Sequence, residues 1–385
     1  MKKKPIKILA IETSCDETAA AVIEELDGQP VILSNIISSQ IDLHAKTGGV
    51  VPEVASRAHM ETIHPVIALA LLSTRQGIPN LDLNENCKLE IEDYQESIRL
   101  LDDITHIAVT AGPGLIGSLL VGFNAAKSLA YARNLPIIGV NHIEGHIYSV
   151  FDREFPISNF QFPILALTVS GGHTSLNLMT DHGKYTLLGD TIDDAVGEAY
   201  DKVGKLLGLG YPGGPAISKL AGQFRENLKS DYNGVVFPRP IINDGTFNFS
   251  LSGLKTAVLI QAKKKMALLD IEKSTNLPQE IKEEFAYAFE EAVADVLIAK
   301  TVRAIEKFSP KTVIFAGGVS ANKYLQDRLR TAIAKFEASI NFLTPPKELT
   351  GDNAAMIGLA GYYNIKNGKA KNWSEITIDS NWELS

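Results

Sequence analysis

Cysteine is nearly absent from this sequence of 385 residues, which contains only Cys15 and Cys87. Two cysteines outside any Cys-x-x-Cys pair cannot build a disulfide framework. No apolar run reaches the roughly 18–20 residues that a membrane-spanning helix needs. The basic start at Met1–Pro5 also lacks the apolar stretch and cleavage site of a secretory signal. These absences predict a reduced, cytoplasmic protein that makes no membrane contact.

Basic residues are also fewer than acidic ones, and the formal net charge is −8. An overall basic surface, the usual mark of a lone nucleic-acid binder, is therefore excluded. The deficit is concentrated between Arg75 and Asp103, which hold eight acidic and three basic residues. A local basic groove, or one completed by a partner, stays compatible with the remainder of the chain.

The order of predicted strands and helices points to an internal duplication. A chain of this length favours two domains. Three predicted strands open the chain, and after a Pro-rich link three more follow in the same way. Each set is followed later by a buried strand that runs into a Gly-containing turn and a helix. The strands are expected at Ile6–Ile11, Ala19–Glu24, Val31–Ser38 and Ile107–Thr110, and again at Ile164–Val169, Thr174–Met179, Tyr185–Leu188 and Thr312–Phe315.

This order predicts an α/β protein of two duplicated lobes with a cleft between them. The expected lobes are residues 1–155 and residues 156–385. An acidic insertion near 74–103 interrupts the first lobe, and a mostly helical insertion near 190–310 interrupts the second.

His142-Ile-Glu-Gly-His146 places two imidazoles four residues apart. On a helix they share one face, a spacing that lets two nitrogens reach one divalent metal. Two surface histidines would give the same pattern, so the motif alone leaves both interpretations open. A zinc-protease function is excluded, because that pattern needs Glu directly after the first His, where Ile143 stands.

A carboxylate from elsewhere should complete such a site, and Asp352 is the candidate. It precedes the apolar run Ala354–Gly361 and so should lie at a helix start. A plain N-cap aspartate is the alternative explanation, and the two roles are compatible.

Glycine turns are the other chemical signal. One turn, at Ser170–His173, follows a strand. A second, at Gly317–Asn322, also follows a strand and is expected to open a helix at Ser320. Tyr211–Pro215 forms a third turn. Backbone N–H groups in such turns hold phosphate oxygens. Each turn alone would also fit an ordinary tight turn. No GxxxxGK[ST] motif is present, which excludes that class of P-loop NTPase.

Several blocks resemble the bacterial branch of the tRNA N6-adenosine threonylcarbamoyltransferase family, and they follow the family order over nearly the whole chain. They are Ile11–Thr18, Gly48–Arg57, Thr110–Leu115, His142–His146, Thr168–Thr174, Asp193–Ala199, Phe249–Lys255, Phe315–Asn322 and Gly351–Ala355.

The resemblance implies an actin-like fold of the Hsp70 and sugar-kinase type. It implies transfer of threonylcarbamoyl from L-threonylcarbamoyl-AMP to N6 of adenosine 37 in tRNAs that read ANN codons, with release of AMP. One divalent metal per subunit, iron(II) in preference to zinc, would be held by His142, His146 and Asp352. The donor would be contacted by Thr168, Val169, Ser170, Gly171, Gly172, Asp201, Gly214 and Asn322.

The family's bacterial members work with a non-catalytic paralogue and a P-loop ATPase, which are therefore the expected partners besides tRNA and the adenylate. The chain departs from the family at Ser218, where many relatives carry Asp. That contact to the donor is left out of the expected site, and no general base is identified. Two alternative functions share the fold: an actin-like ATPase or small-molecule kinase, and the non-catalytic paralogue itself.

Overall fold

The computed structural model describes residues 4–76, 80–82, 89–151, 160–228, 232–274, 277–336 and 339–384. Cys87 and parts of the expected insertion near 74–103 lie outside the described residues. Among the helices that are described, none combines the length and the apolar character needed to cross a membrane.

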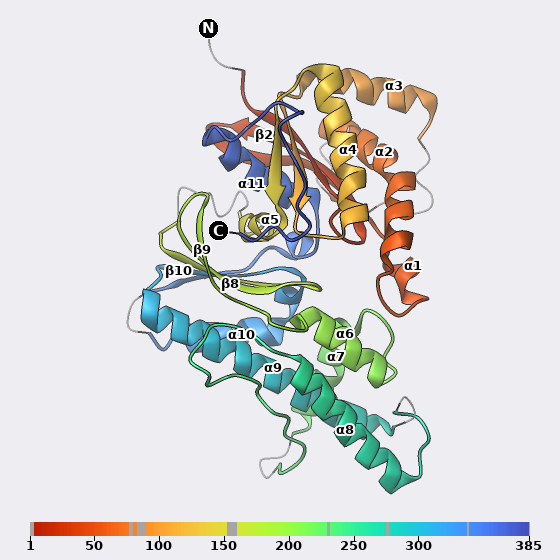
Figure 1. Ribbon diagram of the computed structural model, residues 1–385, viewed down its shortest axis with the longest axis vertical. Coiled ribbons are helices and arrows are strands. Elements are labelled where there is room, and N and C mark those ends of the chain that lie inside the picture. Colours follow the sequence, from red (N-terminus) through yellow and green to blue (C-terminus); the bar gives the residue numbers. More distant parts are fainter. Residues whose placement is uncertain are drawn as a thin grey trace.

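Two mixed β-sheets form the framework (Figure 1). The first has the strand order β4-β3-β2-β1-β5-β6, and the second has the order β11-β10-β7-β8-β9. The strands are β1 (Lys7–Glu12), β2 (Glu17–Leu26), β3 (Gln29–Ser39), β4 (Asn80–Asp82), β5 (His106–Gly112), β6 (Ile137–Asn141), β7 (Ile164–Val169), β8 (Thr174–Asp181), β9 (Lys184–Asp190), β10 (Thr312–Ala316) and β11 (Asn341–Leu343).

The two sheets repeat one topology, which confirms the duplication. In each, an antiparallel meander (β1-β2-β3 or β7-β8-β9) is extended from its first strand by two parallel strands (β5-β6 or β10-β11). The expected strands agree with the observed ones to within three residues at each end. The central strands are buried along their length, which explains their continuous apolar sequences.

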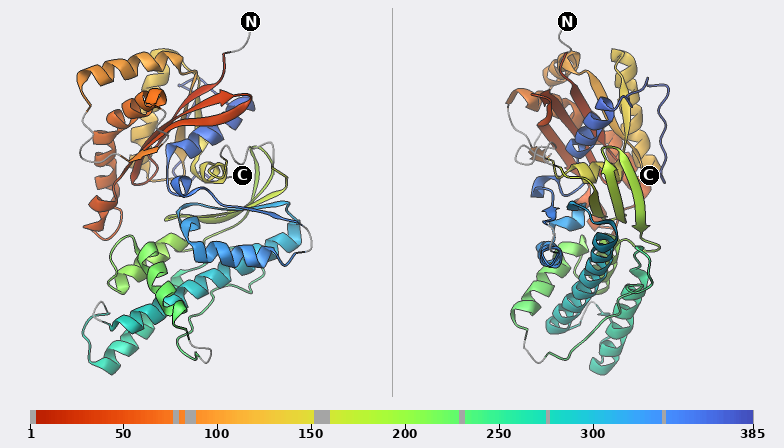
Figure 2. Two further views of the ribbon diagram at one scale, coloured as in Figure 1. Left: turned by 180° about the vertical axis from the view of Figure 1, so that it is seen from behind. Right: turned by 90° about the vertical axis from the view of Figure 1, so that its left-hand side faces the viewer.

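Helices cover both sheets and also lie between them (Figures 1 and 2). The outer face of the first sheet packs on α2 and α4, and the outer face of the second sheet shares one core with the helical layer formed by α6 to α10. Between the sheets lie α5 and α11, whose apolar side chains share one core with both. The helices are α1 (Ile41–Ala45), α2 (Pro52–Gln76), α3 (Ile91–Leu100), α4 (Ile116–Arg133), α5 (His142–Tyr148), α6 (Val196–Leu206), α7 (Gly213–Glu226), α8 (Ser252–Leu269), α9 (Gln279–Phe308), α10 (Lys323–Ile333) and α11 (Ala354–Lys366).

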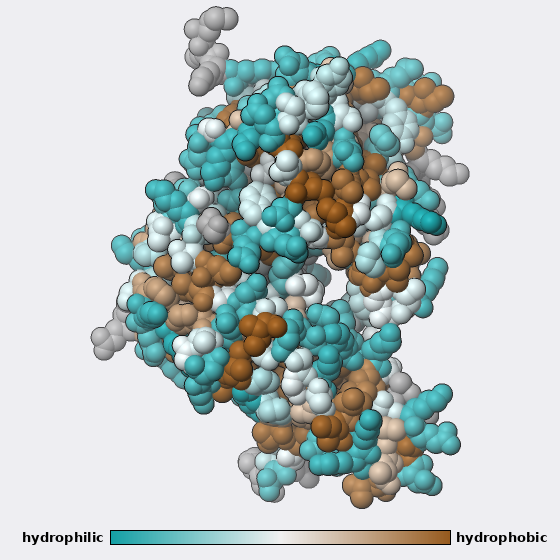
Figure 3. All heavy atoms as spheres, viewed as in Figure 1, coloured by the Kyte–Doolittle hydropathy of each residue, from teal (hydrophilic) through white to brown (hydrophobic). Residues whose placement is uncertain are grey.

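The placement of α11 brings the end of the chain back to its beginning. Although it follows the last strand of the second sheet, α11 packs against β1, β2 and β6 of the first. Its Gly358 and Gly361 allow this close approach, because a Cβ at either position would lie within 3 Å of side chains on the first sheet. Seen as spheres, the molecule is hollowed between its upper and lower halves (Figure 3).

Candidate functional site

Helix α5 begins directly at the end of β6. The side chain of Asn141 caps it by accepting hydrogen bonds from the amides of Ile143 and Glu144, at 2.9 and 3.3 Å. His142 is therefore the first helical residue, and His146 follows one turn later on the same face. Both imidazoles are buried, with exposures of 2% and 0%, so the surface-histidine interpretation is wrong.

Asp352 meets these histidines from the loop that enters α11. Its Oδ1 lies 3.5 Å from Nε2 of His142 and 3.2 Å from Nε2 of His146. The N-cap of α11 is Asn353, whose Oδ1 accepts from the Met356 amide at 3.0 Å. The interpretation of Asp352 as a plain N-cap is therefore wrong, because the next residue performs that task and leaves the carboxylate of Asp352 to face the histidines.

His142, His146 and Asp352 form a group that could hold a metal ion, since one ligand atom of each lies within 4.8 Å of the others. Two atoms bound at about 2.1 Å to one ion stand about 3.0–3.4 Å apart, close to the two distances above. Both ring nitrogens of His146 are buried and make no well-aligned hydrogen bond, although Nε2 lies 3.2 Å from Asp352 Oδ1. Unpaired buried nitrogens of this kind are explained if one of them binds a metal ion. The three residues therefore fit such an ion.

Two more side chains orient His142 from behind. Its Nδ1 lies 3.2 Å from Glu12 Oε2 and 3.1 Å from Ser14 Oγ. The carboxylate of Glu12, fully buried at the end of β1, also accepts hydrogen bonds from the Ser14 amide and the Thr110 hydroxyl. A carboxylate on Nδ1 fixes the tautomer that leaves Nε2 free for a metal, which is the usual support of a ligating histidine.

The charges of this cluster are strongly coupled. Burial lowers the pKa of His142, but the carboxylates of Asp352 and Glu12 outweigh it and raise the pKa to about 9. Burial raises the pKa of Asp352, yet the three neighbouring histidines bring it well below its usual value. For His146, burial prevails and lowers the pKa. The protein without metal therefore keeps a proton on His142 at neutral pH.

Glu144 is directed away from the cluster, as its position in the motif predicts. Its buried carboxylate accepts from the Tyr185 hydroxyl at 2.9 Å and from Asn364 Nδ2 at 2.8 Å. It therefore packs α5 against β9 and α11 and cannot act as a base on a water at the metal.

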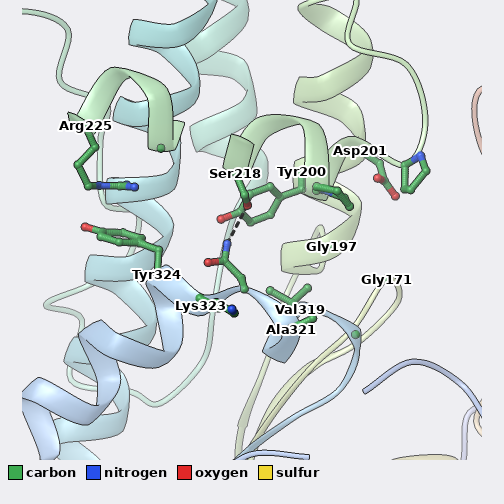
Figure 4. A pocket seen from close by; sticks show the side chains of 16 residues that line it. Gly171, Gly197, Tyr200, Asp201, Ser218, Arg225, Val319, Ala321, Lys323 and Tyr324 are labelled. Atoms are coloured by element: carbon green, nitrogen blue, oxygen red, sulfur yellow. Dashed lines mark hydrogen bonds between the residues drawn. The ribbon is translucent and has the colours of Figure 1, made fainter. Parts of the chain in front are cut away.

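A cavity of about 560 Å³ opens in the second half of the molecule, between the glycine turns and helices α6, α7 and α10 (Figure 4). Gly171, Asp201, Gly214 and Asn322, all expected to contact a donor, line it. Thr168, Val169, Ser170 and Gly172, also expected there, are not among its lining residues. They belong to β7 and the turn that leads to the cavity. The other lining residues are Gly197, Tyr200, Pro212, Pro215, Ser218, Gly222, Arg225, Gly318, Val319, Ala321, Lys323 and Tyr324.

The turn after β7 connects this cavity to the histidine cluster. Gly171 lines the cavity, and two residues later the ring of His173 lies 6.0 Å, centre to centre, from that of His142. A Cβ added to Gly171 or Gly172 would meet nothing within 4 Å, so their backbones face open space. Gly317 differs, because its φ of +87° and its contact with Val169 admit only glycine.

Two of the lining side chains also organise helix starts. Asp201 Oδ1 accepts from the Gly213 amide at 2.7 Å, at the beginning of α7. Asn322 caps α10 by accepting from the Leu325 amide at 3.1 Å. The helix expected from Ser320 begins only at Lys323, because residues Gly318–Ala321 form a 3-10 turn that wraps the cavity instead.

Sequence reasoning missed the polar side chains at the far end of the cavity. Arg225 lies over the ring of Tyr324, 3.5 Å from its centre (Figure 4), and Glu290 supports both Arg225 and Ser218 from α9. One signal was present in the sequence. Glu290 lies one helical turn from Ala286 and one turn from Val293. Both of these residues are apolar and buried. A carboxylate on such a stripe needs a partner and often marks a site.

The family model described as tRNA N6-adenosine threonylcarbamoyltransferase matches residues 31–83 and 92–359 of this chain. Relatives bearing that name include those of Thermodesulfovibrio yellowstonii, 46% identical over 94% of this chain and 95% of its own, and of Geobacter sulfurreducens, 44% identical over 98% and 97%. The crystal structure of T. kodakarensis HypF is similar at a TM-score of 0.57, with 12% identity, over 96% of this chain and 50% of that one. This last likeness concerns the fold alone, which is α/β and actin-like.

Proposed function

This chain belongs to the tRNA N6-adenosine threonylcarbamoyltransferase family, and we propose that it transfers a threonylcarbamoyl group to the N6 amine of an adenosine in tRNA. The observation that carries the proposal is the family match along nearly the whole chain, at 43–46% identity to relatives of the same name. The donor in this proposal is L-threonylcarbamoyl-AMP, and the acceptor is adenosine 37 of tRNAs that read ANN codons.

The cavity beside the glycine turns is the proposed donor site. Its volume of about 560 Å³ is in the range of small-molecule sites. Backbone N–H groups at the turns near Gly171 and Gly318 would hold the phosphate, with Thr168, Val169, Ser170 and Gly172 shaping the first of these turns.

His142, His146 and Asp352 would hold one divalent metal ion, iron(II) in preference to zinc. Bound there, the ion supplies Lewis acidity to carbamoyl or phosphate oxygens of the donor. Glu12 and Ser14 keep His142 in the orientation that this requires. The adenosine amine attacks the carbamoyl carbon, the bond from that carbon to the phosphate oxygen breaks, and AMP leaves. An exocyclic amine is a poor nucleophile, so most of the rate should come from holding the two reactants together.

The proposed setting is cytoplasmic, with a non-catalytic paralogue and a P-loop ATPase as partner proteins. The two other functions considered, a kinase or ATPase and the non-catalytic paralogue, gain no support from the relatives' names. The ligand group, which a non-catalytic partner has no need to retain, is complete here.

A reconstitution tests the proposal. The protein, its partners, unmodified tRNA, threonine, bicarbonate, ATP and a threonylcarbamoyl-AMP synthase are combined, and the tRNA is digested to nucleosides. Mass spectrometry should detect threonylcarbamoyladenosine only when the protein is present. An unmodified tRNA, in a reaction where a relative's protein succeeds, would exclude the proposed activity.

A further inference from the structure

The last described residues form one wall of a second, smaller cavity. Residues 380–384 run back between the two sheets, beside α5 and β9 (Figure 1). With side chains of β8, β9 and the start of α5 they enclose about 230 Å³, and this cavity is the tail pocket. Its volume lies below the usual range for a whole small-molecule ligand, so it suits one part of a larger ligand.

Hydrogen bonds and a buried side chain fix this wall to the rest of the protein. The Gly114 amide donates to the Ser380 carbonyl at 3.2 Å. Asn141, whose Oδ1 caps α5, donates from Nδ2 to the Trp382 carbonyl at 3.0 Å. Leu384 is buried in the core around α5 and α11. The wall is therefore held by the same helix that carries two of the candidate metal ligands.

The tail pocket lies next to the candidate metal group. His173 lines it, and the ring centre of His173 is 6.0 Å from that of His142. Ile143, which follows His142 on α5, lines it as well. Gly171, two residues before His173, lines the donor cavity. The short turn after β7 thus contributes to both cavities.

The tail pocket offers hydrogen-bond acceptors. Asn177 is 1% exposed, and its Nδ2 donates to Ser175 Oγ at 3.0 Å, but its Oδ1 has no hydrogen-bond partner among the described residues. Asp190 and Glu383 add two carboxylates, and the described lining residues include no lysine or arginine. A buried acceptor without a partner costs free energy, which a ligand that donates a proton would recover. The pocket therefore favours a ligand part that carries N–H groups and no negative charge.

Trp382 gives the pocket an aromatic wall. Its side chain lines the tail pocket and is 36% exposed. Unpaired nucleic-acid bases stack on exposed aromatic rings and form hydrogen bonds through their edges. A base with an exocyclic amine is flat, uncharged and a donor of N–H groups, so it matches this pocket in each respect.

We infer that the tail pocket receives the acceptor adenine of the RNA, with its ring on Trp382 and one N–H of its N6 amine donated to Asn177 Oδ1. This inference rests on the proposed function, which supplies the adenosine. The second N–H stays free of this contact, and the donor cavity lies on the other side of the turn that holds His173. The threonine part of the donor is a poorer occupant, because its carboxylate would face the acceptors of this pocket.

The test measures how tightly anticodon stem-loop RNAs bind to the protein together with its partner proteins, by fluorescence anisotropy and without the donor. The RNAs carry either adenosine or purine riboside, which lacks the amine, at position 37. The adenosine RNA should bind about tenfold more tightly, the usual worth of one well-placed hydrogen bond. In Asn177→Ala the acceptor is gone, and this preference should fall to about twofold or less.

Trp382→Leu separates stacking from hydrogen bonding. It should weaken binding of both RNAs by about tenfold and keep the preference for adenosine. Trp373→Leu is the matched control, because this other tryptophan packs on Tyr131, with ring centres 5.1 Å apart, and does not line the tail pocket. Thr180→Ala, at an exposed position on the same strand as Asn177, is the control for that variant. Both controls should bind the two RNAs as the unsubstituted protein does.

Three results would overturn the inference. The first is equal binding, or no binding, of the two RNAs by the unsubstituted protein. The second is an undiminished preference for adenosine in folded Asn177→Ala, or undiminished binding in folded Trp382→Leu. The third is a loss of transfer in Asn177→Ala with RNA binding unchanged, because the pocket would then hold part of the donor. The transfer assay separates all three from a failure of the proposed function, since the unsubstituted protein would still form modified tRNA.

Discussion

At the scale of single residues, His146 carries an energetic cost that a bound ion would reduce by binding one of its two ring nitrogens. Its side chain is fully buried with neither ring nitrogen hydrogen-bonded, and an unsatisfied buried polar group costs about 1–3 kcal/mol. Asp352 lies near enough for electrostatic attraction. A shared metal ion would bind one nitrogen of His146 and an oxygen of Asp352 at once, which is a physical reason for this arrangement to persist.

Replacement of His142, His146 or Asp352 by Ala should therefore remove bound metal and transfer activity together, because two protein ligands form a weak site. Metal content after purification, measured by mass spectrometry, and the modified nucleoside are the readouts. His64→Ala is the matched control, since His64 is an exposed histidine on α2 outside the group. Full metal content in all three variants would contradict the assignment of the ligands.

The affinity for metal should rise with pH. In the metal-free protein the pKa of His142 is about 9, so a metal must displace a proton at any lower pH. Affinity for zinc should therefore rise by about tenfold per pH unit between about pH 6 and 8. Competition with a chromophoric chelator measures it. Glu12→Gln removes one of the charges that raise this pKa, so its profile should become shallower. Profiles of equal slope would contradict the role given to Glu12.

At the scale of elements, the site depends on how closely α5 approaches α11. Gly145, between the two histidines, faces α11, and a Cβ there would lie 2.8 Å from Ile357 Cδ1 and 3.2 Å from Met356 Cγ. The histidines lie on one helix and Asp352 immediately precedes the other. The spacing of the two helices therefore sets the distances between the ligands.

Gly145→Val should force the helices apart, destabilise the protein by about 1–3 kcal/mol and lower its metal content. Denaturant unfolding and metal analysis give the two readouts. Gly253→Val on α8 is the control, because the nearest atom to a Cβ there is 3.8 Å away. Unchanged metal content in a destabilised Gly145→Val would show that the ligands adjust independently of the helix spacing.

The described parts of the acidic segment near 74–103 contribute to the first sheet and to its core. β4 adds a sixth strand to the first sheet by pairing with β3, and Leu100 and Leu101 join the core beneath α2 and α4. Its second half contains the helix α3, whose Ser97 and Leu100 are buried. Removing the whole segment would therefore open this core.

At the scale of the whole molecule, the two sheets are joined by a common middle layer. The core around α5 and α11 includes residues from both sheets, such as Ile8 and Ile23 of the first and Ile164 and Ile314 of the second. The three candidate ligands lie within this layer, with His142 and His146 on α5 and Asp352 just before α11. The division of the chain at residue 155 stays a prediction, and α11 packs on the first sheet although it lies beyond that division.

Bound metal should stabilise the whole molecule, because ions that bind only the folded state shift unfolding by mass action. At a free metal concentration about 100 times the dissociation constant, the gain is about 2.7 kcal/mol. Scanning calorimetry with metal and with a chelator should show a higher Tm in the first case. Asp352→Ala should lose this difference. A Tm of the unsubstituted protein that does not respond to metal would contradict a site in the middle layer.

The sequence by itself determined the strands of both meanders together with β5 and β10, the duplication, and the candidate metal ligands. Local rules suffice for these: buried central strands need continuous apolar runs, and histidines four apart share a helix face. Resemblance to the family supplied the expectation that Gly171, Asp201, Gly214 and Asn322 lie near a donor.

Only the tertiary structure decided which partners each polar group has. No local pattern reveals that Glu12 lies behind His142, that Asn353 rather than Asp352 caps α11, or that Ser218 donates a hydrogen bond to Glu290. Glu12 and His142 are 130 residues apart, and Ser218 and Glu290 are 72 apart. Such pairs form because the packing of the helices on two sheets brings them together, and a buried charge must then find its hydrogen bonds among the groups that this packing supplies.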